Sequence, residues 1–206
     1  MNRCLALLAA VLTGLAACAT ERLARESPVG TTGRPAGATR EILDEQTGNT
    51  FFVATRPLVF ARNRSDVAAY TRDYVTLMAV ALNESGKYSE YLLFYRWSTV
   101  DRRMLPPPDP NAGELRIMAD GRTLDLHPLE QVPVSVASRT ELREPNHGDA
   151  ITHAYKMDLP TLRFLAASRT LAIRLPQEAL DTPFELWRDG RPDLERFVAA
   201  QGERGR

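Results

Sequence analysis

The chain has 206 residues, and its 26 basic side chains are balanced by 26 acidic ones. This neutral balance argues against a nucleic-acid-binding surface, which needs a clear excess of basic residues. About 160 residues follow the N-terminal segments, which is enough for one domain with its own hydrophobic core. Length and charge therefore predict a single folded domain and no nucleic-acid partner.

Residues 1–17 have the layout of a secretory signal peptide. Arg3 is followed by an apolar run from Leu5 to Leu12, and small residues precede Cys18. The uncharged stretch is shorter than the roughly twenty residues that a membrane-spanning helix needs. The segment is therefore predicted to direct export and then to be removed.

The four residues Leu15-Ala16-Ala17-Cys18 resemble the lipobox of bacterial lipoproteins, in which an aliphatic residue and two small residues precede an obligatory cysteine. The resemblance implies cleavage before Cys18, a diacylglyceryl group on its sulfur, and an amine that can be acylated, for example with palmitate. Two or more chains make membrane anchoring stable. Two alternatives stay open: an ordinary secretory signal, and a buried apolar helix with a free cysteine.

Residue 19 is Ala and not Asp. In Gram-negative lipoproteins, Asp at this position tends to retain the protein at the inner membrane. The resemblance therefore implies the outer membrane, with the protein on its periplasmic face, although surface exposure is an open alternative. Cleavage would remove Cys4 and lipidation would use Cys18, so the mature domain has no thiol for catalysis or for a zinc–cysteine site.

Residues 18–40 are predicted to be a lipidated cysteine followed by a flexible tether. Gly, Pro, Thr and Ser dominate residues 19–40, and no apolar period is present. Such a chain would span about 25 Å, which would hold a domain clear of the lipid headgroups. The folded domain is then expected over residues 41–201, and residues 202–206 are expected to fray.

The domain is predicted to begin with short strands at residues 50–55 and 57–63, with Arg56-Pro57 bending the chain between them. The clearest signal covers residues 74–99, where two apolar runs flank a polar tip, Asn83–Lys87. This pattern predicts a β-hairpin. Because both runs are apolar on both faces, the hairpin should lie in the middle of a layered structure.

Residues 101–113 contain three consecutive prolines and are predicted to form an extended crossing loop. Docking of this stretch into an aromatic groove of a partner is an alternative. Residues 113–129 predict a second hairpin with Asp120-Gly121 at its turn. A further strand is expected at residues 132–138 and a surface loop at 139–149.

The C-terminal part mixes strands and helices. Further strands are predicted at residues 151–157, 170–176 and 183–189. Asp158 is a candidate N-cap for a helix over residues 159–168, and Pro192 is expected to start a second helix. The predicted fold class is mainly β: an antiparallel β sandwich or barrel-like sheet with two short C-terminal helices, with α+β as the alternative.

The sequence contains no Gly-x-Ser-x-Gly elbow, no phosphate-binding glycine loop and no His-Glu-x-x-His motif. His147, Asp149 and His153 are weak metal-ligand candidates, because imidazole and carboxylate suit zinc or iron. Their spacing crosses from a loop into a strand, so a half-buried, hydrogen-bonded His153 and an exposed His147 are the preferred interpretation. No catalytic residue and no cofactor is predicted.

Aromatic residues of the first hairpin form a candidate ligand pocket. They are Tyr91, Phe94, Tyr95 and Trp97. The alternative is cross-strand packing in the core of the sheet. Glu90 and Arg96 should share a face with apolar neighbours, where they would pair with nearby groups or mark an opening.

The expected function is a non-enzymatic binding or envelope-interaction module on the outer membrane. Its expected partners are the lipid bilayer, through acylated Cys18, and another envelope protein or a small ligand. The alternative is an envelope hydrolase or metal-dependent enzyme that uses His147, Asp149 and His153.

Overall fold

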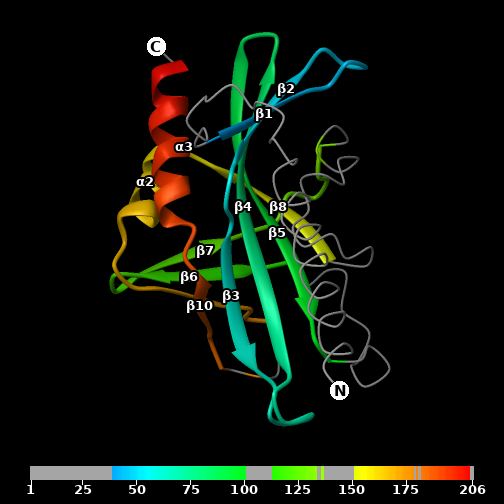
Figure 1. Ribbon diagram of the computed structural model, residues 1–206, viewed down its shortest axis with the longest axis vertical. Coiled ribbons are helices and arrows are strands. Elements are labelled where there is room, and N and C mark those ends of the chain that lie inside the picture. Colours follow the sequence, from blue (N-terminus) through cyan, green and yellow to red (C-terminus); the bar gives the residue numbers. More distant parts are fainter. Residues whose placement is uncertain are drawn as a thin grey trace, which may run out of the picture. The chain divides into compact units, whose positions relative to one another are not determined.

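The computed structural model describes residues 39–100, 113–133, 136, 151–178, 180 and 182–204. Within these ranges the chain forms ten strands and two helices (Figure 1). Their bounds are β1 Thr39–Leu43, β2 Thr50–Ala54, β3 Leu58–Asn63, β4 Arg72–Glu84, β5 Lys87–Ser98, β6 Leu115–Ala119, β7 Arg122–Leu126, β8 Ile151–Met157, α2 Leu159–Ala167, β9 Leu171–Arg174, β10 Phe184–Arg188 and α3 Arg191–Arg204. The predicted signal peptide, most of the predicted tether and the proline-rich loop lie outside these ranges.

The described strands form one antiparallel sheet around the long hairpin of β4 and β5, which pair from Asp73↔Ser98 to Glu84↔Lys87. β8 pairs with the free edge of β5. β2 and β3 share the other edge of β4, one toward each end. Beyond them, β1 pairs with β2, while β10, β9, β6 and β7 continue in that order from β3. The predicted fold class, an antiparallel β sheet with two C-terminal helices, is confirmed.

At Pro57 one edge of β4 passes from pairing with β2 to pairing with β3, so the sheet divides into two branches. Val53 of β2 lies opposite Val80, and Leu58 of β3 lies opposite Leu77, so the two strands follow one edge of β4 with a short interruption. Proline has no backbone N–H and cannot donate to a strand ladder, which explains why the edge is interrupted here. The fork sends one branch to β1 and the other to β10.

The central hairpin is covered by apolar side chains on both faces, as its sequence predicts. One core cluster contains alternate residues of β4 and β5 together with residues of α2, α3, β6, β9 and β10. The second cluster, on the opposite face, contains the intervening residues and side chains from β2, β8 and Val136. Figure 1 shows α2 and α3 on one side of the central strands, where they cover the first cluster.

Both predicted hairpins are present, and both turn through two residues. Asp120 and Gly121 have φ of 46° and 78°, and Ser85 and Gly86 have φ of 53° and 91°. Positive φ at both positions is the signature of the tight turns that match strand twist. The turn at Ser85-Gly86 is therefore shorter than the five-residue tip predicted for the β4–β5 hairpin. Asn83 closes it, because its Oδ1 accepts a hydrogen bond of 2.7 Å from the backbone N–H of Gly86.

Three boundaries differ from the sequence expectations. β1 begins at Thr39, inside the last two residues of the predicted tether. The strand predicted at residues 132–138 is not formed at its described residues, 132, 133 and 136, because Val136 is helical and its N–H donates to the carbonyl of Pro133. α3 continues to Arg204, where fraying was expected, and the Arg204 guanidinium lies 3.8 Å from the ring centroid of Phe52.

The predicted cap of α2 is confirmed, because Asp158 Oδ1 accepts a 2.7 Å hydrogen bond from the N–H of Thr161. This bond lowers the pKa of the Asp158 carboxyl. Arg191 joins the two helices by donating to the carbonyls of Ser168 and Arg169 at the end of α2. Within the described residues, neither helix has the length and apolarity needed to cross a bilayer.

Candidate functional site

The four aromatic residues of the candidate pocket lie on two opposite faces of β5. Tyr91 and Tyr95, with 8% and 2% of their surface exposed, belong to one core cluster, and Trp97 lies on the same face. Phe94 is 3% exposed and belongs to the other cluster, beneath the helices. Successive side chains of a strand point to opposite faces. The four residues therefore do not surround one common space.

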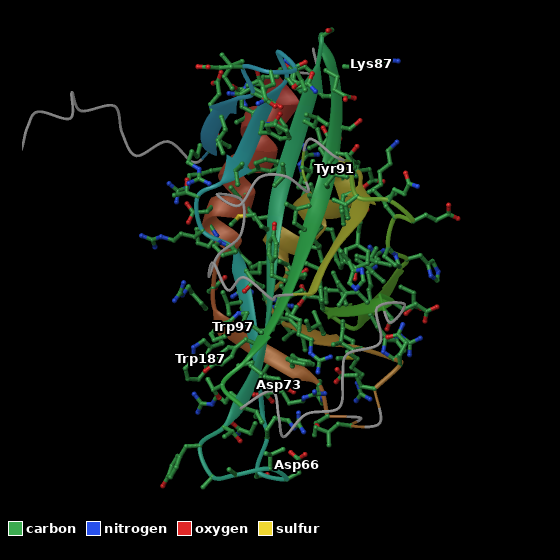
Figure 2. All side chains as sticks on the ribbon, turned by 90° about the vertical axis from the view of Figure 1, so that its right-hand side faces the viewer. Asp66, Asp73, Lys87, Tyr91, Trp97 and Trp187 are labelled. Carbon is green, nitrogen blue, oxygen red and sulfur yellow. The ribbon has the colours of Figure 1, made fainter. Side chains whose placement is uncertain are left out.

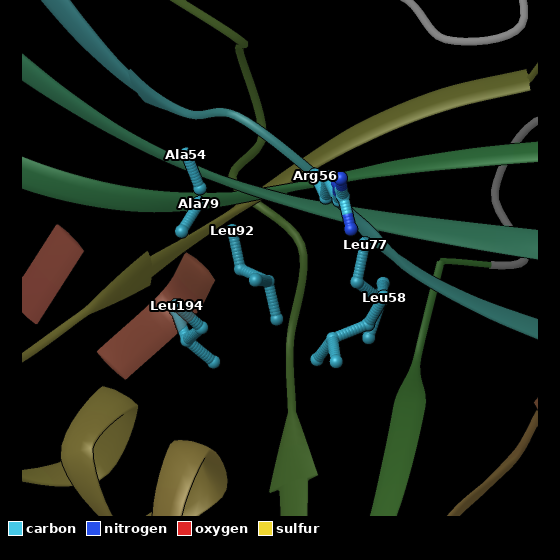
Figure 3. A pocket seen from close by; sticks show the side chains of 7 residues that line it. All are labelled: Ala54, Arg56, Leu58, Leu77, Ala79, Leu92 and Leu194. Carbon is cyan, nitrogen blue, oxygen red and sulfur yellow. The ribbon is translucent and has the colours of Figure 1, made fainter. Parts of the chain in front are cut away.

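A small cavity lies between the sheet and α3 (Figure 3). It has a volume of about 10 Å³, which corresponds to roughly one water molecule. Its lining is aliphatic apart from Arg56 and consists of Ala54, Arg56, Leu58, Leu77, Ala79, Leu92 and Leu194. Pockets for small organic ligands have volumes of about 300–1,000 Å³. This cavity is therefore a packing defect of the core and not a ligand site.

His153 lies on β8 in apolar surroundings. Its ring centroid is 5.7 Å from that of Phe94, and a Cβ added to Gly113 would lie only 3.2 Å from its Cε1. Burial lowers the pKa of His153, and its Nε2 has no hydrogen-bond partner in the described part of the chain. His153 is therefore partly buried, as predicted. The hydrogen bond that was also expected for it is not made by Nε2 within the described residues.

The other metal-ligand candidates, His147 and Asp149, lie outside the described residues, as does the lipidation candidate Cys18. Among the described residues, no three His, Cys, Asp or Glu side chains are grouped so that they could hold a metal ion. His153 is thus the one member of the proposed set that the structure places, and it is packed against an aromatic ring.

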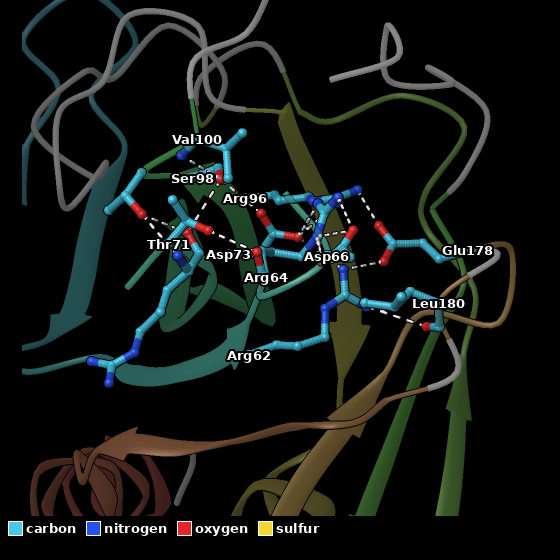
Figure 4. A network of polar contacts seen from close by, with 12 residues as sticks. Arg62, Arg64, Asp66, Thr71, Asp73, Arg96, Ser98, Val100, Glu178 and Leu180 are labelled. Carbon is cyan, nitrogen blue, oxygen red and sulfur yellow. Dashed lines mark hydrogen bonds and ion pairs between the residues drawn. The ribbon is translucent and has the colours of Figure 1, made fainter. Parts of the chain in front are cut away.

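A buried charge network lies at one end of the first core cluster (Figure 4). It contains Arg62, Arg64, Asp73, Arg96 and Glu178, and is called the charge network below. On β3 and β5 the charged residue follows two inward apolar residues, whereas on β4 Asp73 stands before them. Glu178 approaches from the segment between β9 and β10. The network therefore joins four separate parts of the chain.

Asp73 is at the centre of the charge network, and its side chain is 1% exposed. Its Oδ2 lies 2.9 Å from Nη2 of Arg62 and 3.0 Å from Nη1 of Arg64. Ser98 donates a 2.7 Å hydrogen bond to the other carboxylate oxygen. Burial alone would raise the pKa of Asp73, but the hydrogen bonds from Ser98 and the two arginines outweigh it, so the pKa lies below its ordinary value.

Arg62 connects the two buried carboxylates. Its side chain is 4% exposed, and its Nη2 also lies 2.6 Å from Glu178 Oε2. The guanidinium carbon is 4.2 Å from the ring centroid of Phe184, a cation–π contact. Arg96 completes the network through an ion pair with Glu178. Because Arg64 also pairs with Asp66, three guanidinium groups in the described residues meet three carboxylates, and the charges cancel.

This arrangement is suited to structure and not to chemistry on a substrate. Each carboxylate lies within ion-pair distance of at least one guanidinium group, so each is held in its charged form by a counter-charge. A pattern in the sequence could have identified the cluster. Arg62 follows Leu58 and Phe60 at a spacing of two, and Arg96 follows Leu92 and Phe94, so both occupy positions on an inward face. Glu90 and Arg96 were both expected near apolar surface. Arg96 belongs to the charge network, through its ion pair with Glu178. Glu90 is partly buried, and this burial raises the pKa of its carboxyl.

Acid is expected to weaken the fold through Asp73. A carboxyl whose pKa is lowered on folding stabilises the native state at pH values above its ordinary pKa, about 3.9 for Asp. This contribution is lost as the pH falls through the folded-state pKa. Urea unfolding at pH 7, 5, 4 and 3 should show a declining midpoint below about pH 4. Asp73→Asn should flatten this decline, and an unchanged slope would contradict the assignment.

Comparisons with known proteins add no relative from which a function could be transferred. No protein-family model, no curated protein and no solved structure matches the chain. Function therefore has to follow from the residues of the chain itself.

Proposed function

We propose that this chain is a lipoprotein of the outer membrane, held on the periplasmic face by acyl chains on Cys18, and that its folded domain is a non-enzymatic binding module. The observation that carries the proposal is the run Leu15-Ala16-Ala17-Cys18, placed directly after a short apolar segment that begins near Arg3. A lipidated cysteine at this position would become the first residue of the mature protein, and the domain would follow it.

Features of the folded domain support binding as its role and not catalysis. The buried carboxylates of the charge network are held by guanidinium groups, and His153 is packed against Phe94. The cavity beneath α3 has space for about one water molecule. Recognition by such a domain would use its outer surface, and the partner would be the bilayer, another envelope protein or a small ligand.

Lipidation is tested by comparing Cys18→Ser with Cys4→Ser in the full chain. Mass spectrometry of the native protein should find a mature N-terminus at residue 18 that carries diacylglycerol and an additional acyl chain. Cys18→Ser should move the protein to the soluble periplasmic fraction or leave an uncleaved precursor. Cys4→Ser alters only the segment that is removed, so this variant should be acylated and membrane-bound like the native protein.

The domain itself should stay folded in Cys18→Ser, because residues 19–38 separate the cysteine from β1. Circular dichroism and protease resistance of the released domain check this. An intact leader in the native protein, or a processed N-terminus without acyl mass, would contradict the proposal.

A further inference from the structure

Exposed aromatic residues gather at one end of the central hairpin. Figure 2 shows Trp97 and Trp187 near Asp73 and Asp66, far from Lys87 at the opposite tip of the hairpin. Trp187 is 56% exposed, and Tyr70 is fully exposed. Tyr70, Arg72, Tyr74 and Trp187 are called the end surface below. Large aromatic side chains with this exposure are unusual in the described part of the chain, where the other aromatic rings are at least partly buried.

The sheet itself turns Trp187 outward. The register of β10 against β3 shifts between Leu186 and Arg188, as in a β-bulge, and Trp187 is the residue at the shift. Bulges of this kind redirect a side chain. The indole lies edge-on to Tyr74 with ring centroids 6.5 Å apart, and the guanidinium carbon of Arg72 is 4.3 Å from its centroid. The exposed ring is therefore held in a defined orientation.

A second pair of rings supports this orientation from behind. Tyr74 and Trp97 stack face to face, with centroids 4.0 Å apart and planes inclined by 7°. The Trp97 Nε1–H donates to Thr76 Oγ1 at 3.3 Å. Stacked rings on neighbouring strands resist reorientation. Trp97 of β5 thus fixes Tyr74, and Tyr74 in turn supports Trp187 of β10, so the rings of the end surface are held in place.

Tyr70, the remaining aromatic residue of the end surface, lies in the loop between β3 and β4, two residues before Arg72. Tyr70 has φ of 66°, a left-handed conformation that costs a non-glycine residue roughly 1–2 kcal/mol. The loop is nevertheless held in place, because the single proton of the Thr71 hydroxyl is within hydrogen-bond distance of the carbonyl oxygens of Arg64 and Ala68, at 2.8 and 2.7 Å. Strained residues of this type cluster at active sites, ligand clamps and switch regions. Here the strained residue carries a fully exposed aromatic ring.

The composition of the end surface matches one class of partner. Tyr and Trp are enriched at the boundary between bilayer and water, where their rings lie at the level of the headgroups, and Arg adds attraction to anionic lipids. Resting on the proposed function, we propose that the end surface contacts the headgroup region of the bilayer that holds the acyl chains of Cys18. The domain then has a second membrane contact in addition to its anchor.

The chain length between the anchor and the domain allows this contact. The tether enters the domain at Thr39, the first residue of β1. Thr39 lies opposite Ala54 of β2, and Val53, which precedes Ala54, lies opposite Val80 of β4. Tyr74 is six residues from Val80 along β4, or about 20 Å. Residues 19–38 can span at most about 70 Å when fully extended. The end surface can therefore reach the membrane without unfolding of β1.

The two tryptophans of the chain make the contact measurable. Trp97→Phe keeps a ring against Tyr74 and leaves Trp187 as the single tryptophan. The acylated mature protein is placed in vesicles of phosphatidylethanolamine and phosphatidylglycerol, with brominated acyl chains in a parallel sample. Trp187 emission should shift to shorter wavelength, lose intensity with brominated lipid and be shielded from aqueous iodide.

A matched control reports on the opposite end of the domain. In a Trp97→Phe, Trp187→Phe background, Lys87→Trp places the single tryptophan at the other tip of the hairpin, where emission should stay water-like and insensitive to brominated lipid. Tyr70→Ser with Arg72→Gln should reduce the quenching of Trp187, and circular dichroism of this variant checks that it is folded. Higher salt should also reduce the quenching of Trp187, because it screens the attraction between Arg72 and anionic lipid headgroups.

Several outcomes would overturn the inference. Equal quenching at both ends would mean that the domain has no preferred orientation, and no quenching at Trp187 would mean that the end surface stays in water. Shielding of Trp187 on native envelope membranes but not on lipid vesicles would assign the end surface to a protein partner. Each of these results leaves lipidation intact if the acyl mass is present, whereas a missing acyl mass overturns the proposed function instead.

Discussion

Replacing Asp73 by alanine is expected to lower the free energy of unfolding by about 3–5 kcal/mol, because removing one partner of a buried ion pair leaves the other charge uncompensated. Arg62 and Arg64 both lie within 3.0 Å of this carboxylate. The Arg62 side chain is almost fully buried, so water cannot replace the lost oxygen atoms. Glu178 would be left as the single carboxylate against Arg62. Urea unfolding at pH 7 measures the effect.

An exposed pair provides the control for this prediction. Arg116 and Asp125 form an ion pair of 2.6 Å across β6 and β7, with about half of each side chain exposed to solvent. Exposed pairs contribute little to stability because water and salt screen them. Asp125→Ala should therefore leave the unfolding midpoint almost unchanged. Equal effects of Asp73→Ala and Asp125→Ala would show that the charge network does not stabilise the domain.

Gly190→Ala is expected to destabilise the domain by about 3 kcal/mol, near the upper end of the usual range for overpacked sites. A Cβ at Gly190 would lie 2.4 Å from the carbonyl oxygen of Pro57 and 2.7 Å from that of Arg56. Both neighbours are backbone atoms, so no side-chain rotation can relieve the contact. The Gly190 carbonyl also accepts from the N–H groups of Asp193 and Leu194 at the start of α3. Displacement of this turn would therefore loosen the helix over the core.

The other described glycine near α3 gives a control of opposite sign. Gly202 lies inside the last turns of α3, and the nearest atom to an added Cβ is Arg163 Nη2 at 3.9 Å. Alanine is favoured over glycine in a helix by up to about 1 kcal/mol. Gly202→Ala should leave stability unchanged or raise it in the same thermal and urea experiments. A Gly190→Ala protein as stable as Gly202→Ala would contradict the close approach at Pro57.

The elements that could be predicted are those whose signals are local. Asp120-Gly121 tolerates the positive φ of a tight turn, and Asp158 supplies an acceptor for the first turn of α2. The two-faced apolar pattern of β4 and β5 identified the central strands, because its cause is contact on both sides of the sheet. The strand predicted at residues 132–138 was wrong at Val136, which is helical, since an apolar run with a proline resembles a strand.

The charge network and the end surface could be predicted only in part. The sequence places Arg96 on an inward face, but its partner Glu178 lies in the segment between β9 and β10, where no local pattern points to it. Arg62 likewise donates to the carbonyl of Leu180, 118 residues away. Trp187 is exposed because the register of β10 shifts at this position, and a register shift depends on the neighbouring strand.

The sequence alone determined the class of the fold, and it also carries the prediction of an address at the outer membrane. A lipobox is recognised as a short linear segment, and strand, turn and cap preferences act over a few residues, so neither needs distant contacts. Only the tertiary structure decided which charges meet at the end of the core and which aromatic rings remain outside. Both depend on how β3, β4 and β10 pair, because strand register sets which side chains become neighbours.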